Sequence, residues 1–257
     1  MSAWGGLLKK ELRLGLIGFL VPFFLGVSTV GLAGYMAHKY SEPAILVATA
    51  IAAIIGHLFY LPLYVAVSIS GEQGKMHLWL HNPLSGYALL SAKYMSGLIT
   101  MALSLLIPAL TFYWNRDHFS SLAVSSDQWT LFLLVTLFFV VAASFYLTLW
   151  GVLLWAISRL LVPYLGKLRW LAMIVLVMVG LWLFSYWEST AFYRAVTEWG
   201  AIDLDFVRFM FNFAEDGFTM EMREIGSFYI GSVVYDLVVA SAVFLLSGWL
   251  LDRKIEV

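Results

Sequence analysis

Cysteine is absent from this 257-residue chain, and charged residues make up only 12% of it. Without cysteine the protein has no disulfides, no thiol catalysis and no cysteine-ligated metal site. The net charge of −1 argues against a nucleic-acid partner, because phosphate binding draws on clustered lysine and arginine. The sequence also lacks a serine nucleophile motif and paired catalytic carboxylates, so it gives no support for an enzyme.

Apolar residues are abundant instead, at 62% of the chain against roughly 45–50% in soluble domains. A helix needs about 20 apolar residues to cross a bilayer, since the hydrocarbon layer is roughly 30 Å thick and each residue rises about 1.5 Å. Six windows meet or approach this length, and their charged residues are Lys93, which opens the third, and Asp236, inside the sixth. We predict an all-α integral membrane protein in which residues 1–257 form a single transmembrane domain, with spans at about 14–37, 44–70, 90–114, 129–157, 170–187 and 226–250.

The basic residues indicate the orientation, because cytoplasmic loops retain lysine and arginine. The first window is too long for the apolar part of a cleavable signal peptide, so we expect it to remain as the first span. If the amino terminus lies inside, ten of the fifteen basic residues are cytoplasmic. We therefore expect a multi-pass protein with both termini in the cytoplasm. The ten residues are Lys9, Lys10, Arg13, Lys75, Lys93, Arg159, Lys167, Arg169, Arg253 and Lys254.

The longest predicted loop, 188–224 between the fifth and sixth spans, has the periodicity of helices. Phe192, Val196 and Trp199 recur at helical spacing, and Gly200 separates them from a second set. We predict two short amphipathic helices here, which either lie on the outer leaflet or cap the outer ends of the bundle. The second set comprises Ile202, Phe206, Phe209 and Phe213.

The segment 71–85, on the predicted cytoplasmic side between the second and third spans, is also amphipathic. Its apolar residues share one helical face, while Glu72 and Lys75 lie on the other. A helix here would end before Pro83, because a residue that precedes proline is pushed out of the helical region. We predict a short, exposed helix over 72–82 that either lies on the membrane or docks into another protein. The apolar face comprises Met76, Trp79, Leu80 and Pro83.

The segment 72–93 contains, in order, an acidic residue and a glycine, a short apolar predicted helix, a proline with a small polar residue, and a lysine that opens the third span. These residues are Glu72, Gly74, Pro83, Ser85 and Lys93. This order resembles the ABC-2 type permeases, which are the membrane subunits of many bacterial ATP-driven exporters. The segment 7–13 is similar to the amphipathic helix that this family places at the inner membrane surface. Six spans and a helical outer segment also match the family's plan.

The resemblance implies a transport subunit in the bacterial cytoplasmic membrane, surrounded by lipid and without a cofactor of its own. The chain has no G-x-x-x-x-G-K-[ST] phosphate loop, so ATP and Mg²⁺ would be bound by a separate ATPase subunit, present in two copies. A second permease subunit, identical or related, would complete the complex. The direction of export comes from the resemblance alone, and the sequence does not identify the substrate. The residues expected to couple to the ATPase are Glu72, Gly74, Lys75, Trp79 and Pro83.

Polar side chains inside the spans are candidates for the substrate pathway. The second span carries a stripe at helical spacing, and the sixth span carries Asp236. Polar groups in hydrocarbon face the bundle interior or a cavity, so these side chains either line a pathway or form interhelical hydrogen bonds. Ser96, Thr100 and Ser104 form a similar stripe in the third span, for which packing is the expected role. The stripe in the second span comprises His57, Tyr60, Tyr64 and Ser68.

Two other functions stay open from the sequence. The first is an intramembrane enzyme with Asp236 and His57 as its active groups. The second is a membrane sensor or assembly factor that uses the acidic outer segment as a receptor surface. A metal site is not expected, because His77 and His81 have the i, i+4 spacing of chelating residues but lack a nearby third ligand.

Overall fold

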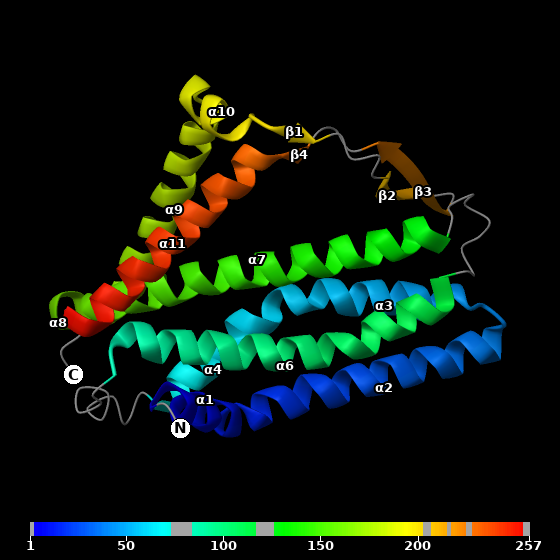
Figure 1. Cartoon of the computed structure of the whole chain (residues 1–257), viewed down its shortest axis with the longest axis horizontal. Coiled ribbons are helices and arrows are strands. Elements are labelled where there is room, and N and C mark those ends of the chain that lie inside the picture. The colour runs from blue at the N-terminus through cyan, green and yellow to red at the C-terminus, as the bar shows by residue number, and fades with distance from the viewer. Residues whose placement is uncertain are drawn as a thin grey trace. The chain divides into compact units, whose positions relative to one another are not determined.

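The computed structural model describes residues 3–72, 84–116, 126–202, 207–214, 217–224 and 228–253. Most of these residues are helical (Figure 1). Within the described part of the chain, six helical stretches are long and apolar enough to cross a membrane, so the predicted six-span plan is confirmed at that level. They are Leu16–Tyr40, Ala44–Glu72, Gly86–Asn115, Asp127–Leu160, Val162–Glu188 and Ile230–Asp252.

The chain forms two compact units, Met1–Leu160 with Val243–Val257 and Leu161–Ala242. The prediction of one permease domain over 1–257 stays a prediction. The first unit contains α1 (Ala3–Leu14), α2 (Leu16–Tyr40), α3 (Ala44–Gly56), η1 (His57–Phe59), α4 (Tyr60–Glu72), α6 (Gly86–Asn115), α7 (Ser126–Leu160) and the end of α11 (Ile230–Arg253). The second contains α8 (Val162–Leu165), η4 (Gly166–Leu168), α9 (Arg169–Glu188), α10 (Ala191–Thr197), β1 (Ala201–Ile202), β2 (Val207–Ala214), β3 (Gly217–Glu224), β4 (Phe228–Tyr229) and the start of α11.

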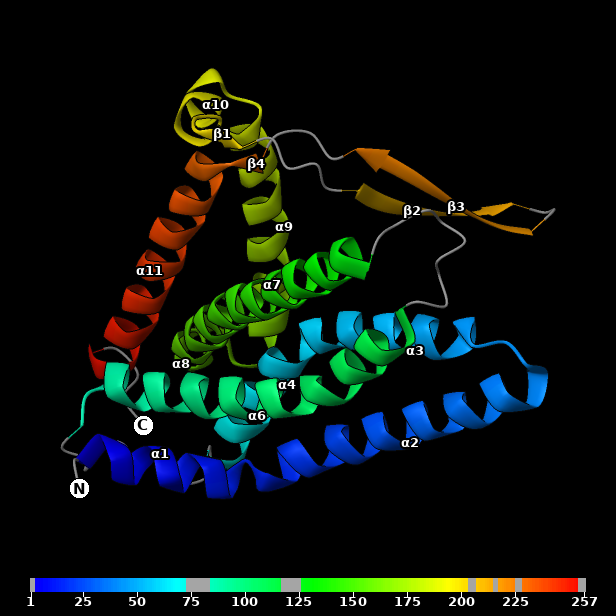
Figure 2. The same ribbon diagram turned by 45° about the vertical axis from the view of Figure 1, so that its right-hand side comes forward.

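Helix α6 is the central element of the first unit. It packs against α1, α2, α3, α4 and α7, and Figure 2 shows α1 beside its first turns. Its buried side includes Leu90, Lys93, Ser96 and Met101. Because α6 touches most of its unit, a group on this helix can contact several elements at once.

The second candidate span is broken near its middle into α3 and α4 by the short 3₁₀ turn η1. Pro62 explains the break, since its ring replaces a backbone N–H and crowds the carbonyl four residues earlier. The Leu61 N–H instead donates to Ser144 Oγ of α7 at 3.3 Å. A side chain of a neighbouring helix therefore satisfies a backbone group at the break.

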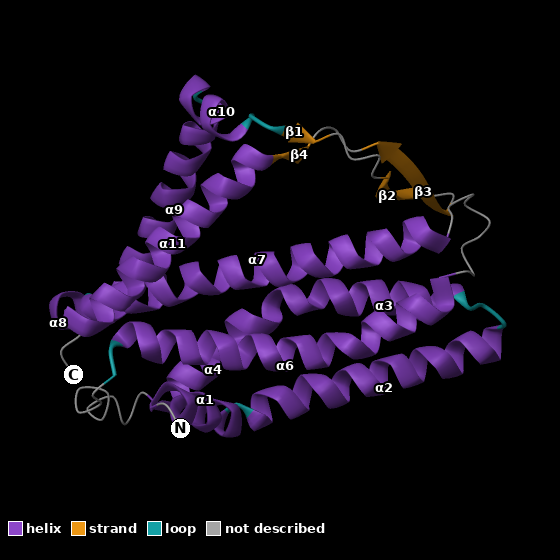
Figure 3. Cartoon of the chain, in the orientation of Figure 1, coloured by secondary structure: helices purple, strands orange, loops and turns teal. Residues whose placement is uncertain are grey.

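The outer segment differs from the two predicted helices. The first is present as α10, which Thr190 caps by accepting from the Tyr193 N–H at 3.2 Å. The prediction of a second helix is wrong, because Val207–Ala214 and Gly217–Glu224 are antiparallel strands that pair Phe209 with Met222 (Figure 3). The sequence VRFMFNFA alternates aromatic residues with other residues at every second position, which is the period of a strand. The fold class is therefore mainly α with short strands.

The predicted helices at the inner membrane surface are described only in part. The amino-terminal segment is helical, as α1. Glu72 is the last residue of α4, and the remainder of the predicted 72–82 helix lies outside the described residues. Gly74, Lys75, Trp79 and Pro83 therefore lie outside them as well.

Candidate functional site

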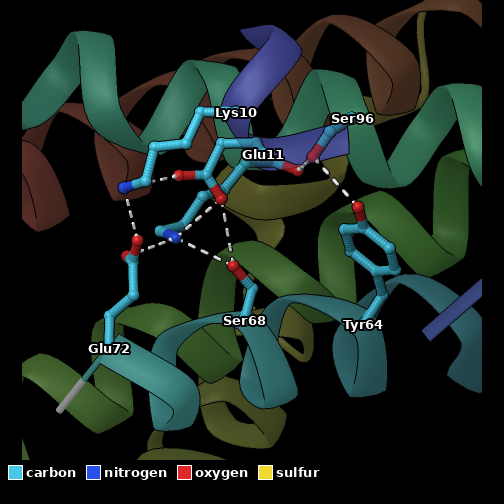
Figure 4. Close-up of polar contacts among 7 residues, drawn as sticks. Lys10, Glu11, Tyr64, Ser68, Glu72 and Ser96 are labelled. Atoms are coloured by element: carbon cyan, nitrogen blue, oxygen red, sulfur yellow. Dashed lines mark hydrogen bonds and ion pairs between the residues drawn. The ribbon is translucent and has the colours of Figure 1, made fainter. Parts of the chain in front are cut away.

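A buried group of charges joins three helices of the first unit. This charge cluster comprises Lys10 and Glu11 of α1, Ser68 and Glu72 of α4, and Lys93 of α6. Figure 4 shows Glu11, Ser68 and Glu72 directed toward a common centre. Lys93 is only 1% exposed and Glu11 only 2%. Lys and Glu are almost never this deeply buried unless they are paired.

The ammonium of Lys93 is the centre of the charge cluster. Its Nζ lies 2.9 Å from Glu11 Oε2, 2.8 Å from Ser68 Oγ and 2.7 Å from Glu72 Oε2. An ammonium has three donors, so these three acceptors match its capacity. Ser68 Oγ in turn donates to Glu11 Oε2 at 3.2 Å. Burial of the charge is thus compensated by direct pairing and hydrogen bonding.

Lys10 extends the charge cluster to the surface of the unit. Its Nζ lies 2.7 Å from Glu72 Oε1 and 3.7 Å from Glu11 Oε1, and its side chain is 52% exposed. Partial burial disfavours the charged ammonium, but the hydrogen bond and charge of Glu72, helped by Glu11, raise the pKa of Lys10 above its usual value. Lys10 therefore stays protonated at neutral pH, and two lysines balance two carboxylates.

The amphipathic pattern of α1 directs Glu11 into the unit. Leu7 and Glu11 are four residues apart and are both buried, and Leu7 packs on Leu89 and Ala92 of α6. Trp4 adds a hydrogen bond from its indole N–H to Ser91 Oγ at 3.1 Å. The same face of α1 therefore supplies apolar contacts and one carboxylate to α6.

A polar seam continues from the charge cluster between the second and third candidate spans. The Tyr64 hydroxyl donates to Ser96 Oγ at 3.3 Å, and His57 Nε2 lies 3.1 Å from Ser104 Oγ. The rings of His57 and Tyr60 are stacked at 5.6 Å, and those of Tyr60 and Tyr64 at 6.3 Å. The two polar stripes predicted from the sequence therefore face each other as interhelical contacts. Their role in a pathway stays a prediction.

Glycines allow the close approach of helices around Tyr64. A Cβ at Gly15 would lie 1.7 Å from the Tyr64 hydroxyl oxygen. A Cβ at Gly97 would lie 2.4 Å from Leu61 Cδ1 and 2.9 Å from Tyr64 Cδ1. The Tyr64 ring thus occupies space that any larger residue at either position would take.

Glu72 is less accessible than the sequence suggested. Its side chain is 13% exposed, and Lys10 and Lys93 pair with both carboxylate oxygens. The predicted contact with an ATPase stays a prediction, but at Glu72 it would involve a carboxylate already held by two lysines.

Two members of the charge cluster were not predicted from the sequence as site residues. Lys93 appeared only as part of a family pattern, and Glu11 was not singled out. The signal for Glu11 was its position on the Leu7 side of an amphipathic helix.

The remaining candidates are not members of the charge cluster. His57 belongs to the first unit, where its Nδ1 is 2.7 Å from the Ala53 carbonyl oxygen. Asp236 belongs to the second unit and is exposed on α11. Among the described residues, no group of three or more His, Asp or Glu side chains is arranged to hold a metal ion.

A third carboxylate lies at the start of α6. Asp252, at the end of α11, accepts from the Gly86 N–H at 2.5 Å, while the side chain of Ser85 accepts from the Ala88 N–H at 3.4 Å. A negative charge at a helix amino terminus is favourable because the first N–H groups lack intrahelical partners. The end of α4 and the start of α6 are thus both held by carboxylate contacts.

Comparison with known proteins gives one similarity over the full length. The chain is 26% identical over 268 residues to the "Uncharacterized protein YhcE" of Bacillus subtilis (strain 168), with 100% of both chains covered. No protein-family profile matches the sequence, and no solved structure matches it significantly. The similarity therefore concerns the whole chain and assigns no activity to it.

Proposed function

We propose that this protein is the membrane permease subunit of an ATP-driven exporter, with ATP hydrolysis carried out by a separate ATPase subunit. The six candidate spans suit a membrane subunit, and the sequence lacks the phosphate loop that ATP hydrolysis requires. The resemblance of 72–93 to ABC-2 type permeases supplies the class of transporter. The complex would contain two ATPase subunits and a second permease chain in a bacterial cytoplasmic membrane.

The observation that carries this proposal is the ion pairing of Glu72 at the end of α4. Its carboxylate contacts Lys93 of α6 and Lys10 of α1, so three elements share the position from which residues 73–83 emerge. Asp252 of α11 accepts from the Gly86 N–H at the start of α6. A force on 73–83 would therefore reach α4, α6, α1 and α11 through short, charged contacts.

In the proposed mechanism, closure of the ATPase subunits pushes on 73–83. Helices α4 and α6 move as stiff levers, because packed helices shift between discrete arrangements more readily than they deform. The charge cluster keeps α1 attached to both levers during this movement. The polar seam keeps the second and third spans in register. Access to the pathway between two permease subunits then changes sides.

The direct test is purification of the tagged full-length chain from its host in mild detergent, followed by mass spectrometry of the bound proteins. We expect a near-stoichiometric partner that carries a phosphate loop. If the chain is isolated alone, or only with partners bound to its outer surface, the exporter assignment is wrong.

A variant then tests the role of Glu72 within the complex. Glu72→Gln should leave membrane insertion and binding of the ATPase partner unchanged. In liposomes, ATP hydrolysis should become uncoupled from transport, because residue 72 no longer carries the negative charge that pairs with Lys10 and Lys93. Glu42→Gln is the matched control, since Glu42 is an exposed carboxylate at the loop between α2 and α3. Normal coupling in Glu72→Gln would contradict the proposed coupling route.

A further inference from the structure

The side of α1 that faces away from α6 is basic. Lys9, Lys10 and Arg13 are exposed and lie within about 100° of one another around the helix axis. Glu11, which is buried and pairs with Lys93 of α6, lies about 160° around the axis from Arg13. The packing that buries Glu11 therefore directs the three basic residues outward.

Two of these three positive charges have no counter-charge in the described part of the chain. The Lys10 ammonium pairs with Glu72 and Glu11, whereas neither Lys9 nor Arg13 forms an ion pair with a described residue. The carboxylates of Glu11 and Glu72 are already neutralised inside the charge cluster. The exposed side of α1 therefore has an excess of positive charge.

An exposed apolar row on α2 continues from this basic side. Helical hydrogen bonds pass through Gly15, because its N–H donates to the Glu11 carbonyl at 2.8 Å and its carbonyl accepts from the Phe19 N–H at 2.9 Å. Residues at intervals of four therefore follow one another from α1 into α2. The row that begins with Lys9 and Arg13 continues with apolar residues that are 65–75% exposed, namely Ile17, Val21 and Leu25.

The row has the dimensions of one phospholipid. From Arg13 to Leu25 the helix rises about 18 Å, of which the apolar part from Ile17 to Leu25 accounts for about 12 Å. One half of the hydrocarbon layer is roughly 15 Å thick. If Arg13 lies at the level of the headgroups, the apolar part of the row therefore lies beside the acyl chains of the same leaflet.

We propose that Lys9 and Arg13, together with the apolar row of α2, bind an anionic phospholipid. The two cationic side chains pair with the headgroup phosphate, and the apolar row contacts the acyl chains. Each lysine or arginine near an anionic membrane surface strengthens binding about fivefold. An acidic protein surface would match the charges of Lys9 and Arg13 but would leave the adjoining apolar row without a partner. The inference does not depend on the proposed function.

The test is a lipid titration of the purified full-length chain in detergent, with the bound lipids counted by native mass spectrometry. The probes are dioleoylphosphatidylglycerol and dioleoylphosphatidylcholine, which share their acyl chains and differ in net charge. We expect the natural sequence to bind its first phosphatidylglycerol at least tenfold more tightly than phosphatidylcholine. The double replacement Lys9→Gln with Arg13→Gln should abolish this preference, whereas Lys9→Arg with Arg13→Lys should retain it.

Lys39→Gln is the matched control, because Lys39 is an exposed cation near the opposite end of α2. It should leave the preference for phosphatidylglycerol unchanged. Glycerol phosphate, which has the charge but no acyl chains, should not displace the bound lipid.

Four results would overturn the inference. They are equal affinity of the natural sequence for the two lipids, an equal loss of preference in Lys39→Gln, displacement of the lipid by glycerol phosphate, and an intact preference in the double glutamine variant. If that variant kept its lipid preference but lost a protein partner, the basic side of α1 would be a protein contact instead. The titration needs no ATPase, so its failure is distinct from that of the proposed function.

Discussion

At the scale of the residue, Lys93 is the most constrained charge in the described part of the chain. Its ammonium is almost fully buried and contacts two carboxylates and a hydroxyl. Transfer of a charge from water into such a site is unfavourable by several kcal/mol, and the partners offset this only while all of them are present. Removal of Lys93 would therefore leave Glu11 and Glu72 without the ammonium that they share.

The replacement Lys93→Met tests this dependence. We expect a loss of about 3–5 kcal/mol in the free energy of unfolding, because Glu11 and Glu72 would stay buried without their shared cation. The measurement is unfolding of the detergent-solubilised chain, followed by tryptophan fluorescence. Lys10→Met is the matched control and should change stability by no more than about 1 kcal/mol, since Lys10 is half exposed. Equal effects of both replacements would show that Lys93 is not the centre of the cluster.

At the scale of the element, close packing between α4 and α6 depends on the glycine at position 97, which has no side chain. Leu61 and Tyr64 of α4 occupy the space that a Cβ at Gly97 would take. The same contact aligns Tyr64 with Ser96 and brings Ser68 and Glu72 to Lys93. Helix packing and the charge cluster are therefore geometrically linked.

The replacement Gly97→Ala should separate these two helices. We expect a destabilisation of about 1–3 kcal/mol, typical of an overpacked core, measured by the same unfolding experiment. Gly26→Ala on α2 is the control, because no atom outside the adjacent residues and the nearby backbone of α2 lies within 4 Å of the added Cβ. Alanine also has the higher helix propensity, so the control should be neutral or slightly stabilising. A neutral effect at Gly97 would mean that α4 and α6 can move apart without loss.

At the scale of the whole molecule, the proposed function depends on the orientation of the spans. The charge bias predicts that α1, η4 and the carboxyl terminus lie in the cytoplasm and that α10 lies outside. Lys167 in η4 and Glu198 after α10 are both exposed, and they flank α9. These two positions therefore report on opposite ends of one candidate span.

Single-cysteine labelling can test the orientation directly, because the chain has no cysteine of its own. Glu198→Cys should react with a membrane-impermeant maleimide in intact cells. Lys167→Cys should react only after the cells are permeabilised. The reverse pattern would invert the topology and move the charge cluster to the outside, where an ATPase could not reach it.

The six-span plan could be predicted from the sequence, because a long uncharged run leaves few alternatives to a membrane-spanning helix. The polar stripes of the second and third spans were also visible, since helical periodicity puts their members on one face. The second outer helix was predicted wrongly. Aromatic residues in 202–213 fit helical spacing in part, but the alternation over 207–214 fits a strand better.

Only the tertiary structure decided which charges meet. Glu11, Glu72 and Lys93 are far apart in the chain, and periodicity carries no information on contacts between helices. Their pairing depends on the rotation of α1 and α4 against α6, which the packing of Leu7 on Leu89 and of Tyr64 beside Gly97 determines. The sequence by itself thus determined which segments can enter a membrane, through the cost of unpaired polar groups in lipid. Side-chain packing decided that Lys93 neutralises Glu11 and Glu72.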